Sequence, residues 1–302
     1  MFHPLSQATR DRLIGGGLDP DAVAAIVRMT VSEDLAGGID ITSVATVPAE
    51  QRSTGEFTSR AEGVLAGLPI AAAVIETVCG DSATFEYLAN DGDRVHGGRQ
   101  PVATVTAPTR ALLTAERSAL NLLCQLSGVA TLTRRWADAL EGTPARVRDT
   151  RKTTPGLRAL EKYAVRCGGG VNHRMGLSDA ALVKDNHVLA AGGVRPAFEK
   201  VRALDGLVPI EIEVDSLDGL REAIDAGADV ILLDNFDTAR MRQAVAIRNS
   251  TRRSVILEAS GGLTLDTARA VGETGVDYIA VGELTHSPKV LDLGLDLVAI
   301  VD

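Results

Sequence analysis

The pattern of apolar and polar positions divides the chain into two parts with different periodicities. From residue 145 onward, six short runs rich in apolar and β-branched residues recur, and helical spans separate most of them. The six runs are ARVRDT, ALVKDN, PIEIEVDS, DVILLDN, SVILEASGG and YIAVGEL. Alternation of strand and helix predicts parallel strands joined by right-handed crossovers. The polar strand ends recur at intervals of 21 to 29 residues, which favours an α/β barrel, although an open sheet stays possible.

The first 110 residues mix helical and strand patterns. DAVAAIVRMTVSEDL has helical spacing, and residues 49–106 then show short strand patterns separated by turn signals. Asp-Gly in NDGDRVHGG (90–98) favours a tight turn. Residues 112–140 have helical spacing that is interrupted near Ser127 and Gly128, which predicts a pair of bridging helices.

Composition narrows the class of protein. With 302 residues, 45% of them hydrophobic, the chain can bury a large core, and its net charge of −9 argues against a general nucleic-acid binder. Three separated cysteines form no CxxC pair, so neither a zinc site nor a disulfide framework is indicated. The longest apolar run, residues 64–75, is too short to span a bilayer, and the first residues lack the order of a signal peptide. We therefore expect a cytoplasmic protein without a membrane partner.

Basic residues concentrate in one window of this acidic chain. Residues 146–184 contain nine Lys or Arg and only three acids. Such a local excess predicts a compact anionic ligand. The cations expected at strand ends or in loops are Arg151, Lys152, Arg174 and Lys184, whereas Arg158, Lys162 and Arg166 are expected on the solvated face of a helix. Because Lys184 ends an apolar run, it should have an anionic partner from the protein or a ligand.

Two glycine-containing loops predict a phosphate site. Ser260, Gly261 and Gly262 follow one strand and precede a helix, and Gly282 and His286 follow the next strand. Glycines let backbone N–H groups close on an anion, and late βα loops of barrels commonly bind phosphate.

Two carboxylates end neighbouring predicted strands. Glu213 and Asp234 suit Mg²⁺ or a cationic sugar transition state. Alternatively, they form internal salt bridges with Lys184 or Lys152.

These elements together resemble the quinolinate phosphoribosyltransferase family, the decarboxylating nicotinate-nucleotide pyrophosphorylases. The resemblance covers nearly the whole chain and is most specific in DTRKTTPGLRALEKYAVRCGGGVNHRMGLSDAALVKDNH (149–187). Shorter matching segments are EDLAGGIDITS, SRAEGVLAGL, ERSALNLLCQLSGVATLT, EIEVD, LLDN, EASGG and VGELTH.

The resemblance implies a fold and an assembly. We expect an incomplete seven-stranded α/β barrel with an N-terminal open-faced α+β sandwich domain. Residues 1–125 and 288–302 would form the sandwich with a bridging helix, and residues 126–287 the barrel with the active site. A homodimer is implied, in which Arg117 completes the neighbouring subunit's site.

The resemblance also implies an activity and roles for residues. The reaction would join quinolinate and phosphoribosyl pyrophosphate with Mg²⁺ and give nicotinate mononucleotide, pyrophosphate and CO₂, a step of NAD biosynthesis. Implied contacts to quinolinate are Arg117, Arg151, His173, Arg174 and Lys184. Implied contacts to phosphoribosyl pyrophosphate are Lys152, Glu213, Asp234, Ser260, Gly261, Gly262, Gly282 and His286. Lys152, Lys184, Glu213 and Asp234 would be catalytic, and Glu213 and Asp234 would bind the metal.

Three other interpretations stay open. Lys184 could form a Schiff base in a lyase or aldolase that acts on a phosphorylated substrate. A related phosphoribosyltransferase could act on another heteroaromatic carboxylate. A carrier domain could use the hairpin-like segment 91–105, although that segment contains no lysine at its turn. His187 could line the site or have a structural role.

Overall fold

The computed structural model describes residues 2–204, 208–251 and 253–301, and it divides into two compact units. The first unit comprises Met1–Leu132, Thr154–Gly169 and Ser287–Asp302, and the second comprises Thr133–Thr153 and Gly170–His286. Among the helices of the described segments, none is both long and apolar enough to cross a bilayer.

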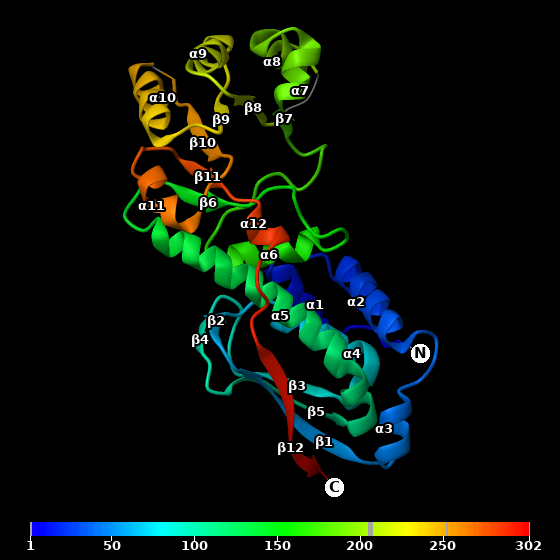
Figure 1. The fold of residues 1–302 in the computed structure, drawn as a ribbon. Coiled ribbons are helices and arrows are strands. Elements are labelled where there is room, and N and C mark those ends of the chain that lie inside the picture. Colours follow the sequence, from blue (N-terminus) through cyan, green and yellow to red (C-terminus); the bar gives the residue numbers. More distant parts are fainter. Residues whose placement is uncertain (1, 205–207, 252, 302) are drawn as a thin grey trace. The chain divides into compact units, whose positions relative to one another are not determined.

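The first unit is built around an antiparallel sheet with the strand order β12-β1-β5-β3 (Figure 1). Its strands are β1 (Arg52–Ser59), β3 (Thr84–Tyr87), β5 (Gln100–Pro108) and β12 (Leu293–Val301), and a separate pair is formed by β2 (Glu62–Val64) and β4 (Arg94–His96). Central strand β1 places Phe57 opposite Ala103 on β5 and Leu295 on β12. Because β4 and β5 belong to different sheets, residues 91–105 do not form the single hairpin that the carrier interpretation requires.

Seven helices of the described residues complete the first unit or begin in it. They are α1 (Gln7–Gly15), α2 (Pro20–Leu35), α3 (Ile41–Thr46), α4 (Leu68–Cys79), the 3-10 helix η1 (Gly80–Ser82), α5 (Thr109–Ala139) and α6 (Arg158–Cys167). Helix α4 is apolar on nearly all sides and is almost completely buried, as expected for a central helix of a core.

Helix α5 is continuous, so the predicted break near Ser127 and Gly128 is wrong. Both residues serve packing instead. The Ser127 hydroxyl lies 3.1 Å from the Ala66 amide and 3.2 Å from its carbonyl oxygen, within hydrogen-bond distance of both. A Cβ at Gly128 would overlap the carbonyl oxygen of Lys289, so glycine is required by a crossing backbone.

Segment 154–169 packs in the first unit, whereas the sequence assigned it to the barrel. Tyr163 donates a hydrogen bond to Asp91 Oδ2 at 2.6 Å, and Arg166 donates one to the carbonyl of Gly16 at 2.5 Å. Lys162 is fully buried, so its predicted solvated position is also wrong. The residue pattern of a helix distinguishes its apolar face from its polar face. It cannot show that another segment of the chain packs against the polar face.

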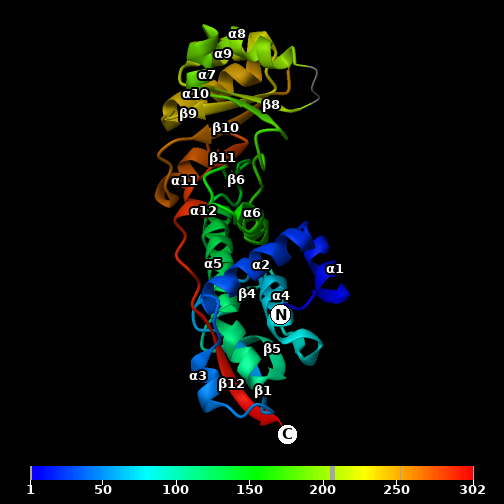
Figure 2. The same ribbon diagram turned by 90° about the vertical axis from the view of Figure 1, so that its right-hand side faces the viewer.

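The second unit contains a six-stranded parallel sheet in the order β6-β11-β10-β9-β8-β7. The strands are β6 (Arg146–Arg148), β7 (Ala181–Val183), β8 (Ile210–Val214), β9 (Val230–Asp234), β10 (Ile256–Ser260) and β11 (Tyr278–Ala280). They coincide with the six predicted runs, which confirms the α/β barrel class. The helices are α7 (Asp185–Ala191), α8 (Val194–Arg202), α9 (Leu217–Ala226), α10 (Thr238–Ser250), α11 (Leu265–Gly272) and α12 (Glu283–His286). Helices α8, α9 and α10 lie along the outer side of β8 and β9 (Figures 1 and 2).

The barrel is incomplete between β6 and β7, the first and last strands of this order. At the place of the expected seventh strand, the described chain forms only an isolated bridge between Arg148 and Val171. Beyond this bridge the chain leaves the sheet, because the next polar groups donate hydrogen bonds to the Asp149 carboxylate. The donors are Asn172 Nδ2 and the His173 amide. The parallel sheet of the described residues thus has six strands, and Val171 adds a single parallel bridge at its edge.

Candidate active site

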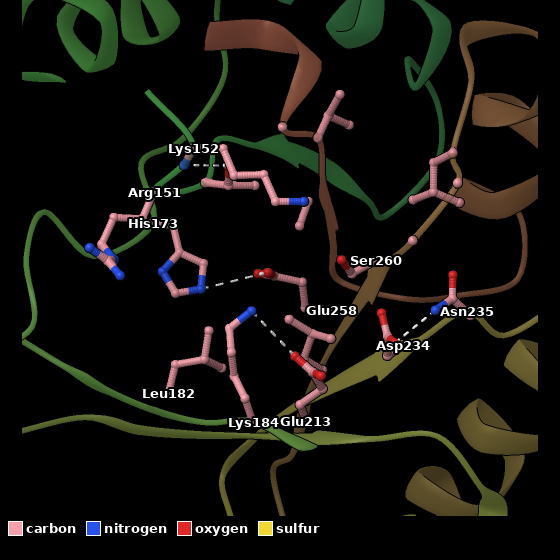
Figure 3. Close-up of a pocket in the computed structure, with 18 of the residues that line it drawn as sticks. Arg151, Lys152, His173, Leu182, Lys184, Glu213, Asp234, Asn235, Glu258 and Ser260 are labelled. Carbon is pink, nitrogen blue, oxygen red and sulfur yellow. Dashed lines mark hydrogen bonds and ion pairs between the residues drawn. The ribbon is translucent and has the colours of Figure 1, made fainter. Parts of the chain in front are cut away.

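One cavity of about 640 Å³ opens at the carboxyl ends of the parallel strands (Figure 3). In a barrel these ends meet at one mouth, so residues far apart in sequence converge there. The cavity contains twelve of the residues named from the sequence: Arg151, Lys152, His173, Arg174, Lys184, Glu213, Asp234, Ser260, Gly261, Gly262, Gly282 and His286.

Arg117 is the named residue that does not line this cavity. It lies on α5, its side chain is 64% exposed, and it approaches the neighbouring Glu116 only to 4.0 Å.

Lys184 has the anionic partner that its position required. Its Nζ lies 3.7 Å from Glu213 Oε2, and the two side chains point toward each other in Figure 3. The lysine side chain is 49% exposed, so it is far less buried than the preceding apolar run suggested. Burial raises the pKa of Glu213, Lys184 lowers it, and Asp234 raises it further. The internal salt bridge that was the alternative role of Glu213 is thus present.

The Arg174 guanidinium is held by a backbone carbonyl, and the charges of Asp179 and Glu211 also act on it. Arg174 donates from Nη1 to the carbonyl of Ala180 at 3.0 Å. Burial, and then the neighbouring charge of Arg151, lower the pKa of Arg174. Two guanidiniums that disfavour each other's charge make a site that gains from an anionic ligand.

Asp234 ends strand β9 level with Ser260 on β10. Asn235 links the two strand ends, because its Nδ2 donates to Asp234 at 2.8 Å and its amide donates to the Ser260 carbonyl at 3.0 Å. Asp234 and Glu213 line the same cavity, and carboxylate oxygens are ligands that Mg²⁺ prefers. These two residues fit a site for this ion.

In both glycine loops, neighbouring side chains lie close to the glycine backbone. Gly261 has φ +92°, a value that favours glycine, and a Cβ there would lie 2.7 Å from Asn235 Cγ. A Cβ at Gly282 would lie 3.1 Å from Lys152 Cδ and 3.2 Å from His286 Nε2. Backbone N–H groups in such loops can hold phosphate oxygens.

His187 has a structural role in this unit. Its Nδ1 accepts a hydrogen bond from the Lys184 amide at 2.9 Å, which caps the start of α7. It does not line the main cavity.

A buried cluster beside the cavity was not predicted. His173 Nε2 lies 2.8 Å from Glu211 Oε2 and 3.8 Å from Glu258 Oε1, the latter contact being visible in Figure 3. Arg148 Nη1 lies 2.6 Å from Glu258 Oε2 and 3.8 Å from Glu211 Oε2. The one signal in the sequence is EIEV, which places Glu211 on the same face of a strand as Glu213.

Comparisons with known proteins agree with this architecture. The C-terminal domain of quinolinate phosphoribosyl transferase matches residues 129–296, and its N-terminal domain matches residues 40–127. The chain is 52% identical over 278 residues to a nicotinate-nucleotide pyrophosphorylase (carboxylating) of Mycobacterium leprae, covering 92% of this chain and 98% of the relative. A probable enzyme of the same name from Bacillus subtilis is 43% identical over 269 residues, covering 88% and 90%. A solved nicotinate-nucleotide pyrophosphorylase from Francisella tularensis superposes with a TM-score of 0.87 at 38% identity, covering 92% and 96%. This chain therefore belongs to the quinolinate phosphoribosyltransferase family.

Proposed function

We propose that this enzyme transfers the phosphoribosyl group of phosphoribosyl pyrophosphate to the ring nitrogen of quinolinate. The products are nicotinate mononucleotide, pyrophosphate and CO₂, so the reaction serves NAD biosynthesis. The observation that carries the proposal is one cavity in which four cations meet two carboxylates and two glycine loops, in a chain of this family.

The dicarboxylate would bind at the cationic side of the cavity. Arg151, Arg174 and Lys184 offer three positive charges, and His173 lies beside them. A guanidinium matches a carboxylate with two parallel hydrogen bonds, and each bond to a charged group contributes roughly 1.5–3 kcal/mol. Because quinolinate carries two carboxylates, it can form two sets of these contacts and should bind more tightly than a monocarboxylate.

The phosphorylated sugar would bind at the opposite strand ends. Ser260, Gly261 and Gly262 would hold the 5′-phosphate with Gly282 and His286, and Lys152 would face the pyrophosphate. The carbonyl of Lys152 accepts a hydrogen bond from Thr285 Oγ1 at 2.7 Å, which fixes the lysine backbone beside the second glycine loop.

Glu213 and Asp234 would hold Mg²⁺ as the cofactor. When bound, this ion neutralises charge on the pyrophosphate. The fit rests on the two carboxylates at neighbouring strand ends and on the partial desolvation of Glu213. With both substrates present, Lys184 can pair with quinolinate, which leaves Glu213 available.

The chemistry requires mainly placement and charge. The bond between ribose C1 and the pyrophosphate oxygen breaks with its electron pair on oxygen, and Lys152 would stabilise that charge. Glu213 or Asp234 would offset the positive charge that develops on the sugar while the pyridine nitrogen bonds to C1. The ring nitrogen, now cationic, accepts the electrons of the adjacent C–CO₂⁻ bond, CO₂ leaves, and a proton takes its place. We propose this order, with ribosylation before decarboxylation.

Arg117 would act across a homodimer. It is exposed, its ion pair with Glu116 is long at 4.0 Å, and it lies outside the cavity of its own subunit. These properties suit a side chain that completes the neighbouring subunit's quinolinate site. We also propose the cytoplasm as its location, since all three cysteines of the described segments are free thiols.

The Schiff-base alternative receives no support from the geometry. A lysine nucleophile is activated by an apolar pocket or another cation, whereas Lys184 is half exposed and paired with Glu213. The alternative of another heteroaromatic acid is decided by the assay below.

The decisive assay omits one component at a time. Purified protein with quinolinate, phosphoribosyl pyrophosphate and Mg²⁺ should release equal amounts of pyrophosphate, CO₂ and nicotinate mononucleotide, and omission of any one component should abolish all three. Nicotinate in place of quinolinate serves as the comparison. The proposal fails if nicotinate is the better substrate, or if CO₂ is released without phosphoribosyl pyrophosphate.

A further inference from the structure

Lys152 lies in a stretch of the described chain that forms neither helix nor strand. Strand β6 ends at Arg148, helix α6 begins at Arg158, and the lysine stands in the irregular segment between them. Its own amide donates a hydrogen bond to Thr150 Oγ1 at 3.1 Å, a contact inside the same segment. A long, flexible side chain on such a segment needs a contact from another element if its ammonium group is to keep one position.

Thr285 supplies such a contact from the short helix α12. Its side chain is completely buried, and its Oγ1 donates a hydrogen bond to the Lys152 carbonyl at 2.7 Å. The same oxygen lies 3.3 Å from the Gly282 carbonyl oxygen, which is the longer and weaker contact. A hydroxyl has one hydrogen to donate, and the shorter distance indicates that the Lys152 carbonyl receives it.

The turn that carries Thr285 also borders the side chain of Lys152. A Cβ at Gly282 would lie 3.1 Å from Lys152 Cδ and 3.2 Å from His286 Nε2, so the lysine stem and the imidazole both lie against the Gly282 backbone. The amides of Thr285 and His286 donate to the Gly282 carbonyl at 3.2 and 3.3 Å, which fixes this turn. Thr285 therefore joins the backbone of Lys152 to the turn along which the lysine side chain runs.

Accepting the function proposed above, we propose that Thr285 is a positioning residue for Lys152, whose hydroxyl keeps the lysine ammonium group where pyrophosphate departs. Thr285 does not line the cavity, so it acts through Lys152 and not on a substrate. The charge on the leaving oxygen is stabilised most by a group that is already in place when the bond breaks. Without the hydroxyl, the Lys152 backbone loses its bond to α12, and the ammonium group is less often in that position.

Three variants of the intact protein test this role. Thr285→Val is the informative one, because valine keeps the branched shape of threonine and removes the hydroxyl. Thr285→Ser keeps the hydroxyl without the methyl group and should recover most of the activity. Thr274→Val is the matched control, because Thr274 is also buried, donates from Oγ1 to the Val271 carbonyl at 2.6 Å, and lies outside the cavity. Thermal unfolding reports the loss of stability that both valine variants share.

The measurement is the rate of pyrophosphate formation in a single turnover at saturating quinolinate, phosphoribosyl pyrophosphate and Mg²⁺. Thr285→Val should lower this rate roughly 2- to 12-fold, the range expected for one hydrogen bond, and Thr274→Val should leave it unchanged. Calorimetric affinity for quinolinate should change less, because Arg174 and Lys184 are held by other segments. In a Lys152→Ala background, adding Thr285→Val should lower the rate no further, because the residue that it positions is absent.

The outcomes separate this inference from the proposed function. A wild-type rate in Thr285→Val, an equal loss in Thr285→Ser, or a further loss in the Lys152→Ala background would refute the role of Thr285 while phosphoribosyl transfer stands. An equally large loss of quinolinate affinity would also overturn it. If wild type forms no pyrophosphate from the two substrates, the proposed function fails, and the inference with it. If Thr285→Val does not fold, Thr285→Ala takes its place in the same comparison with Thr285→Ser.

Discussion

Replacing Gly261 with alanine tests whether the loop after β10 holds the sugar phosphate. The new Cβ would overlap Asn235 Oδ1 and lie 3.0 Å from the Asn235 amide nitrogen. The side chain of Asn235 would have to rotate and lose its 2.8 Å hydrogen bond to Asp234. The left-handed backbone costs an L-residue about 1–2 kcal/mol, and the lost exposed hydrogen bond adds about 1 kcal/mol. We expect a stability loss of about 2–3 kcal/mol if the loop stays in place.

If the loop moves instead, phosphate binding suffers. Loss of one charge-assisted hydrogen bond should raise KM for phosphoribosyl pyrophosphate roughly 10- to 150-fold, with KM for quinolinate much less affected. Thermal unfolding and steady-state kinetics measure the two effects separately. Gly275→Ala is the control: Gly275 also has a left-handed φ, +94°, and a Cβ 3.1 Å from Val245, but it lies outside the cavity. An equal KM for phosphoribosyl pyrophosphate in the two variants would refute the phosphate role of this loop.

Three further predictions address the remaining parts of the site. Arg174→Ala should weaken quinolinate binding roughly 10- to 150-fold with little change for phosphoribosyl pyrophosphate, as measured by calorimetry; unchanged affinity would remove this arginine from the dicarboxylate site. Because burial raises the pKa of Glu213, protons should compete with Mg²⁺ at unusually high pH, so the Mg²⁺ concentration for half-maximal rate should rise as the pH falls into the mildly acidic range, and less so in Glu213→Gln. Mixed and reassociated Arg117→Ala and Lys152→Ala variants should regain about a quarter of wild-type activity if Arg117 serves the neighbouring subunit, whereas two additive losses without recovery would contradict that arrangement.

The strands of the barrel could be predicted because each is a short local pattern. All six apolar runs form the parallel sheet, and the polar residue that ends each run reaches the shared mouth. Parallel strands make this convergence a matter of topology, so residues as distant as Lys152 and His286 could be assigned to one cavity before any coordinates were known.

The features that sequence missed depend on contacts between distant segments. Ser127 and Gly128 resemble a helix end, but a passing backbone at Lys289 explains the glycine. From its residue type and its place on a helix, Lys162 would be assigned to the surface, and only the fold shows that it is fully buried. Arg148 ends β6 and Glu258 lies inside β10, and a charged residue in a strand normally indicates the solvent side.

The pairing of β12 with β1 has a consequence for biosynthesis. The register joins Ser53 to Ile300, so β1 in the first unit receives this neighbour only after the barrel residues between them have been translated. Until then, β1 of the nascent chain has one unpaired edge, while most of the barrel is translated and can begin to assemble. A stop codon shortly before β12 would leave that edge permanently available to other chains, and such a truncated product should aggregate during expression even though every residue of the catalytic cavity is present.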